Sequence, residues 1–122
     1  MALARMSFQW LVWLYILGVV IQFFLAGLGV MGGEDIEPHE ALGSLLTVVS
    51  LILLIVAFVG KEGRAVIGMC GALLVLAILQ SVWAQIDEPL FLRAFHVFDA
   101  LLIAAIAQHL GQRVGWPTVH RS

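Results

Sequence analysis

Long apolar runs separated by short polar segments dominate the chain. Four runs are long enough to cross the hydrocarbon core of a bilayer as helices, which requires about 20 mostly apolar residues. They cover about residues 8–31, 39–60, 65–86 and 90–110. The connections are short, so consecutive helices are expected to be antiparallel neighbours. The pattern predicts an all-α membrane protein with one domain, residues 1–122, that forms an up-down-up-down bundle of four transmembrane helices.

The first run lies near the start of the sequence, where a signal peptide is the alternative interpretation. Arg5 precedes it, and Leu25-Ala26-Gly27 resembles a small-residue cleavage site. Signal peptides have an apolar core of only about 7–15 residues. The longer run here predicts a helix that is retained.

The composition supports a membrane location. Hydrophobic residues make up 62% of the 122 residues and charged residues 11%, whereas soluble domains contain about 45–50% and about 25%. The mean hydropathy is +1.07. Only six lysines and arginines are present and the net charge is −2, which excludes a nucleic-acid partner. The single cysteine, Cys70, excludes a disulfide framework and any Cys-x-x-Cys metal or haem attachment site.

Charges outside the apolar runs are segregated by segment. The N-terminus, the second loop and the C-terminal segment carry basic residues: Arg5, Lys61, Arg64, Arg113 and Arg121. The first and third loops are purely acidic and contain Glu34, Asp35, Glu37, Asp87 and Glu88. Because basic loops stay on the cytoplasmic side of a membrane, both termini are predicted to be cytoplasmic. The same dipeptide, Glu37-Pro38 and Glu88-Pro89, predicts the first turns of the second and fourth helices.

Ionisable residues inside spanning helices are costly and mark candidate functional sites. The candidates here are His39, Arg93, His96 and Asp99. Most neutral polar residues belong to the same outer half of the bundle: Gln22, Gln80, Ser81 and Gln85. The inner half is almost entirely Leu, Ile, Val and Ala. This asymmetry places the candidate site at the outer end.

Small residues continue below each histidine. In the second helix Gly43 and Thr47 follow His39 at intervals of four, and in the fourth helix alanines follow His96. Gln22 lies in a comparable stripe of the first helix. Such stripes let helices pack closely without a cofactor. They also leave room for a planar tetrapyrrole whose iron takes one imidazole from each of two facing helices, and both interpretations stay open.

The haem interpretation assigns a role to each candidate residue. His39 and His96 would be the axial ligands of one haem b, with Gln22 and Gly43 in the wall of its site. Arg93 would pair with a haem propionate; alternatively it extends to the interface or pairs with an acidic loop residue.

Asp99 and the end of the fourth helix leave further alternatives. Asp99 would accept a hydrogen bond from an imidazole, pair with Arg93 or face glutamines of the third helix. If the fourth helix extends to Trp116, the two histidines lie at one depth. If it ends at Gly111, they are staggered by about 9 Å at about 1.5 Å per residue.

The segment Ile36-Glu37-Pro38-His39-Glu40-Ala41-Leu42-Gly43 resembles the second helix of one four-helix half of the haem A synthase family. In that family each half has histidines on its second and fourth helices that bind haem, and a glutamate lies shortly before the first. The resemblance implies haem ligation by His39 and His96, with Glu37 as the glutamate. This chain has Glu40 where the family normally has arginine, and it corresponds to one half only.

The chain also resembles a group of small uncharacterised bacterial four-helix membrane proteins. The segment Gln22-Phe23-Phe24-Leu25-Ala26-Gly27-Leu28-Gly29, the stretch His39-Glu40-Ala41-Leu42-Gly43 and a histidine early in the fourth helix carry this resemblance. It implies a multi-pass protein of a bacterial inner membrane and brings no established activity.

Three functions are compatible with these observations. The first is a bis-histidine haem b protein in electron transfer or haem handling, with a quinone or a redox partner subunit, because one outer site cannot carry electrons across the bilayer. The second is a non-catalytic subunit or assembly factor of a membrane complex. The third is a small transporter or channel, assembled as a homodimer, that uses Asp99. The sequence contains no P-loop or dinucleotide-binding motif.

Overall fold

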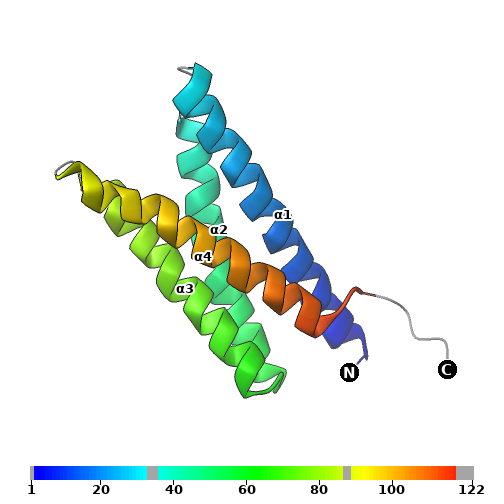
Figure 1. Ribbon diagram of the computed structural model, residues 1–122. Helices are drawn as coiled ribbons and strands as arrows, with labels where there is room; N and C mark the ends of the chain where they lie inside the picture. Colours follow the sequence, from blue (N-terminus) through cyan, green and yellow to red (C-terminus); the bar gives the residue numbers. More distant parts are fainter. Residues whose placement is uncertain (1, 33–35, 87–88, 118–122) are drawn as a thin grey trace.

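Four helices make up the protein (Figure 1). The computed structural model describes residues 2–32, 36–86 and 89–117. The helices are α1 (Ala2–Gly32), α2 (Glu37–Val59), α3 (Arg64–Ala84) and α4 (Leu90–Val114). Each is long and apolar enough to cross a membrane. The predicted all-α architecture with four candidate spanning helices is therefore confirmed.

Two helix boundaries differ from those predicted by more than two residues. α1 begins at Ala2 rather than near residue 8, because the preceding Ala, Leu, Arg and Met residues favour a helix even where they do not cross the membrane. α4 continues to Val114 and ends at Gly115, which has a φ of 81°. Glycine adopts this left-handed conformation without steric cost and commonly ends a helix. α4 thus ends between Gly111 and Trp116, the two ends considered from the sequence. The expected offset in depth between His39 and His96 is therefore intermediate between the two cases.

The two prolines have different places at the helix starts. Pro38 lies in the first turn of α2, as predicted. Pro89 instead precedes α4 with an extended ψ of 153°, and its carbonyl accepts a hydrogen bond from the amide of Leu92 at 3.0 Å. The prediction that Pro89 lies inside the first turn is therefore wrong by one residue. The acidic and basic loop residues Glu34, Asp35, Asp87, Glu88 and Arg121 lie outside the described residues.

The helices contact one another in a closed ring. α1 contacts α2, α2 contacts α3, α3 contacts α4, and α4 contacts α1. In the described part of the chain, the diagonal pairs α1–α3 and α2–α4 have no two Cα atoms within 8 Å. The core between the helices is apolar and includes Phe8, Val12, Leu53, Leu73 and Leu110. The outward faces carry exposed Leu, Ile, Val and Phe side chains, as expected for surfaces that contact lipid.

One end of the ring is held together by polar contacts to the end of α4. Gln9 Nε2 donates a hydrogen bond to the carbonyl of Val114 at 2.7 Å, and Trp13 Nε1 donates to the carbonyl of Gly115 at 3.1 Å. Arg5 forms an ion pair with Glu62, in the segment between α2 and α3. Because carbonyls at a helix end lack partners within the helix, the contacts to Val114 and Gly115 stabilise this end of α4.

The other end of the ring is more open. In Figure 1 the α1–α2 pair and the α3–α4 pair diverge toward the starts of α2 and α4. Both helix starts bring a histidine into this region, His39 from α2 and His96 from α4. The candidate site lies at this end.

Candidate functional site

A cavity of about 430 Å³ occupies the interior where the helix pairs diverge. This volume lies within the range of about 300–1,000 Å³ that is typical of sites for small molecules and cofactors. All four helices line it, and the buried side chains of Tyr15, Val19, Ala77 and Ile103 contribute to its wall. Its candidate ligand-binding residues are His39, His96, Gln22, Gln80 and Gly43.

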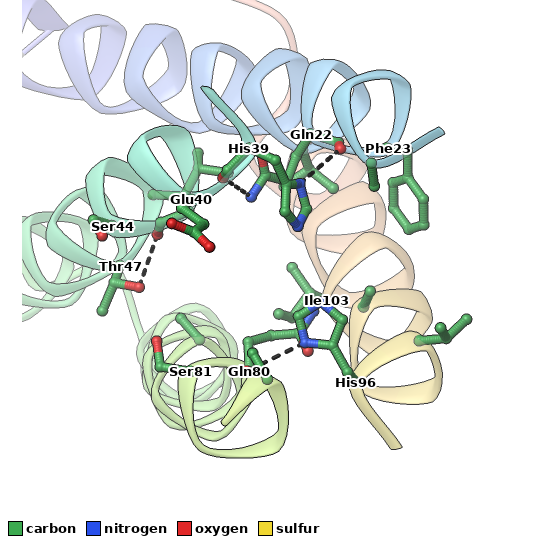
Figure 2. A pocket seen from close by; sticks show the side chains of 18 of the residues that line it. Gln22, Phe23, His39, Glu40, Ser44, Thr47, Gln80, Ser81, His96 and Ile103 are labelled. Atoms are coloured by element: carbon green, nitrogen blue, oxygen red, sulfur yellow. Dashed lines mark hydrogen bonds between the residues drawn. The ribbon is translucent and has the colours of Figure 1, made fainter. Parts of the chain in front are cut away.

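Two imidazoles approach each other across this cavity. Figure 2 shows His39 reaching in from α2 and His96 from α4. Their ring centroids are 6.2 Å apart and their planes are inclined at 74°. α2 and α4 are a diagonal pair of the ring, so only the side chains bring them together here. The structure thus brings together the two histidines that the sequence analysis selected as iron ligands.

Hydrogen bonds to backbone carbonyls orient both rings. His39 Nδ1 lies 3.3 Å from the carbonyl oxygen of Gln22, and His96 Nδ1 lies 3.2 Å from that of Gln80. A carbonyl oxygen can only accept a hydrogen bond, so each Nδ1 must carry the proton. In a neutral imidazole this leaves the lone pair on Nε2. Both histidines are therefore in the tautomer that can bind a metal through Nε2.

The two hairpins repeat the same arrangement, and the sequence analysis missed it. Gln22 in α1 precedes its histidine by 17 residues, and Gln80 in α3 precedes its histidine by 16. The side-chain oxygens Gln22 Oε1 and Gln80 Oε1 are also alike, since both are buried and neither has a hydrogen-bond partner in the described part of the chain. The nearly equal Gln-to-His spacing was the signal in the sequence that could have revealed this repeat.

Gln22 and Gly43 form one corner of the cavity, as predicted. Gln22 Nε2 donates a hydrogen bond to the carbonyl of His39 at 2.7 Å, so Gln22 holds the start of α2 as well as the His39 ring. Gly43 lies one turn after His39, and a Cβ at this position would be only 2.9 Å from Gln22 Nε2. The glycine therefore allows the amide of Gln22 to reach α2.

Arg93 does not line the cavity. Its side chain is exposed on α4, one turn before the lining residues His96 and Val97. Its suggested contact with a haem propionate stays a prediction, and the acidic residues Asp87 and Glu88, its alternative partners, lie outside the described residues.

Asp99 is the most unusual polar residue near the site. Only 4% of its surface is exposed, and neither carboxylate oxygen has a hydrogen-bond partner among the described residues. The expected hydrogen bond from an imidazole is therefore absent. The reason is that His96, the nearest candidate donor on α4, directs its Nδ1 to Gln80 instead.

Further polar side chains lie along the α2–α3 side of the cavity. These residues are Glu40, Ser44, Thr47, Ser81 and Gln85. The sequence analysis did not propose them as cofactor-binding residues. Figure 2 shows Glu40, Ser44 and Thr47 on α2 facing the side on which Ser81 lies. The opposite rim carries the exposed apolar residues Phe23 and Val97. The cavity thus has one polar and one apolar rim.

The sequence profile of one protein family matches residues 22–86. The matched segment is more than half of the chain, and it includes Gln22, His39, Gly43 and Gln80 but not His96. No significant match was found among curated proteins or among solved structures. The chain belongs to the family of unknown function DUF6220.

Proposed function

We propose that this protein binds one haem b between His39 and His96 and acts in electron transfer or haem handling. The observation that carries the proposal is the facing pair of imidazoles, 6.2 Å apart between ring centroids, with both Nδ1 atoms held by backbone carbonyls. Support comes from the spacing of the rings, the number of protein ligands and the surroundings of the pair.

The spacing matches two imidazoles on opposite sides of one metal ion. An imidazole nitrogen binds a metal at about 2.0–2.1 Å, and ring bonds of about 1.33 Å place each nitrogen about 1.1 Å from its ring centroid. Two rings that share one metal in this way have centroids about 6 Å apart. The observed separation of 6.2 Å between the centroids is close to this value.

The number of protein ligands favours a metal that arrives with its own ligands. Protein sites for a bare zinc ion use three or four side chains. In the described part of the chain, no group of three or more His, Cys, Asp or Glu residues is placed to hold a metal. Haem brings the porphyrin nitrogens as ligands of its iron, so the two histidines would be enough to hold it.

The residues around the pair suit such a group. Gln22 and Gln80 fix the imidazole orientations through their carbonyls, an outer contact that tunes a metal ligand. Gly43 removes a side chain from the cavity wall. Arg93 lies one turn before His96 on α4 with an exposed side chain, and it would pair with a haem propionate. A bound haem would supply a one-electron ferric–ferrous couple.

We also propose that the helices cross the membrane in up-down-up-down order with both termini cytoplasmic. Arg5, Lys61, Arg64 and Arg113 are exposed and lie near the termini or in the segment between α2 and α3. This distribution follows the positive-inside rule. The histidine pair then lies toward the outer face of the cell membrane.

A site near one face requires a partner for electron transfer. We propose a bilayer-soluble quinone or a redox subunit as this partner, because the described residues hold no second pair of facing histidines. Alternatively, the protein forms a homodimer. The exposed apolar helix faces are compatible with contacts to a redox subunit or to a second copy of the chain.

The test is a reduced-minus-oxidised visible spectrum of detergent-purified protein expressed with ample haem. We expect the sharp bands of a six-coordinate haem b in the wild type and their loss in both His39→Ala and His96→Ala. His109→Ala is the matched control, since His109 is exposed on α4 and does not line the cavity. A spectrum without haem bands from folded wild-type protein would overturn the proposal, as would bands that persist unchanged in either variant.

A further inference from the structure

Asp99 is a buried carboxylate in the middle of a candidate spanning helix. It is 4% exposed, and among the described residues neither of its oxygens has a hydrogen-bond partner. Asp99 is not among the residues proposed to hold the haem. It lies three residues after His96 on α4.

An ionised carboxylate without a partner is costly in this environment. Moving a charge out of water into a medium of low dielectric constant costs several kcal/mol or more unless an opposite charge lies nearby. None of the described lysines and arginines forms an ion pair with Asp99. Arg5 pairs with Glu62 at the other end of the ring, and Arg93 is exposed.

We propose that Asp99 provides the negative charge that balances a ferric haem held by His39 and His96. This inference rests on the proposed function. The ferric iron carries three positive charges and the porphyrin ring two negative ones, so the oxidised centre has one net positive charge and the reduced centre has none. Among the described residues Asp99 is the buried acidic residue, and it lies three positions after the ligand His96 on α4.

The consequence is a preference for the oxidised state. Reduction adds one electron from an external donor and breaks no bond. Asp99 then loses the positive charge that stabilises its carboxylate, so the carboxylate opposes reduction and lowers the midpoint potential. Asp99 acts through its charge and does not bind the iron.

Neutral substitutions of Asp99 test this inference by redox titration of the haem-loaded protein. Asp99→Asn and Asp99→Leu should each shift the ferric–ferrous equilibrium toward the ferrous state at least tenfold, which corresponds to a midpoint about 59 mV higher for a one-electron couple. Asp99→Glu keeps the charge and should keep most of the wild-type potential. Ser50→Ala is the control for loss of a buried polar group, because Ser50 is fully buried and lies on α2 outside the cavity wall.

A second measurement separates charge from redox chemistry. Gallium(III) protoporphyrin carries the same net positive charge as the ferric form and is not reduced, whereas zinc(II) protoporphyrin is neutral at its centre. Asp99→Asn should weaken binding of the gallium compound about tenfold and leave binding of the zinc compound nearly unchanged. An equal loss of affinity for both compounds would overturn the charge role. Because the two affinities are compared within the same variant, the measurement is valid even if only part of the variant protein folds.

The outcomes distinguish this inference from the proposed function. If wild-type protein binds no porphyrin, both are overturned. If His39 and His96 are required for haem binding but the midpoint is the same in wild type, Asp99→Asn and Asp99→Leu, only the role of Asp99 is overturned.

Discussion

The imidazoles of His39 and His96 lie 6.2 Å apart between their centroids, although no two described Cα atoms of α2 and α4 come within 8 Å. Side chains alone therefore join this diagonal of the bundle. Each ring depends on the helix that precedes it in the chain, because the carbonyls of Gln22 and Gln80 accept its Nδ1–H. Changes in α1 or α3 should consequently alter a site whose ligands come from α2 and α4.

Adding one methyl group at Gly43 should weaken cofactor binding. A Cβ there would be 2.9 Å from Gln22 Nε2, so in Gly43→Ala the amide must move and its hydrogen bond to the carbonyl of His39 is lost. We expect haem affinity to fall severalfold in a titration of haem-free protein. Gly68→Ala is the control, because a Cβ at Gly68 meets nothing within 4 Å and alanine favours a helix. Equal affinities for the two variants would contradict the role of this corner.

Removing the amide of Gln22 should have a larger effect than removing an exposed glutamine. Gln22→Leu loses the 2.7 Å bond to the carbonyl of His39 but keeps the backbone carbonyl that holds Nδ1. The start of α2, which carries His39, is then held less firmly, and we expect haem affinity to fall severalfold. The measurement is the rate of haem transfer to an excess of apomyoglobin. Gln108→Leu, on an exposed position of α4, should leave the rate unchanged.

Stability at the opposite end should depend on Gly111. A Cβ at this position would lie 2.6 Å from Ile16 Cδ1 and 3.2 Å from Trp13 Cζ2, so Gly111→Ala overpacks the contact between α1 and α4. Such overpacking costs about 1–3 kcal/mol. Thermal unfolding in detergent should show a lower midpoint than in Gly27→Ala, where the added Cβ meets nothing within 4 Å. The haem spectrum of folded Gly111→Ala should match the wild type, because Gly111 is remote from the cavity; a changed spectrum would show that the two ends are coupled.

Cysteine labelling tests the orientation in the membrane. In a Cys70→Ala background, Ile36→Cys and Lys61→Cys place single thiols at exposed positions before α2 and after it. An impermeant maleimide added to intact cells should label Ile36→Cys, and the same reagent added to inverted vesicles should label Lys61→Cys. The reverse result would invert the proposed orientation while leaving the four-helix fold unaffected.

The helices and the histidine pair were accessible from the sequence, whereas the contacts that orient the pair were not. Long apolar runs predict spanning helices because the bilayer requires a minimum length, and His39 and His96 stand out because polar residues are rare in such runs. The acceptors of their Nδ1–H groups are backbone carbonyls, which every residue has, so residue type alone does not identify them. Only the similar spacing of Gln22 to His39 and of Gln80 to His96 signalled these contacts.

Asp99 and Pro89 show where local reasoning failed. One of the three roles considered for Asp99 was to accept a hydrogen bond from an imidazole, because it follows His96 by about one helical turn, but Nδ1 of His96 lies against the carbonyl of Gln80 instead. Pro89 was expected inside α4, yet it lies just before the helix, because a proline is also compatible with the extended conformation at that position. In both cases the outcome depends on the geometry of a neighbouring segment, which local sequence patterns do not specify.

Electron paramagnetic resonance of the ferric, haem-loaded protein tests the central claim most directly, because it reports the axial ligands of the iron. Two imidazoles give a strong ligand field, so the wild type should show a low-spin signal. His39→Ala and His96→Ala should each convert it to a high-spin signal, whereas His109→Ala should not. A high-spin signal from the wild type, or a low-spin signal that survives in either cavity variant, would contradict ligation by the His39–His96 pair.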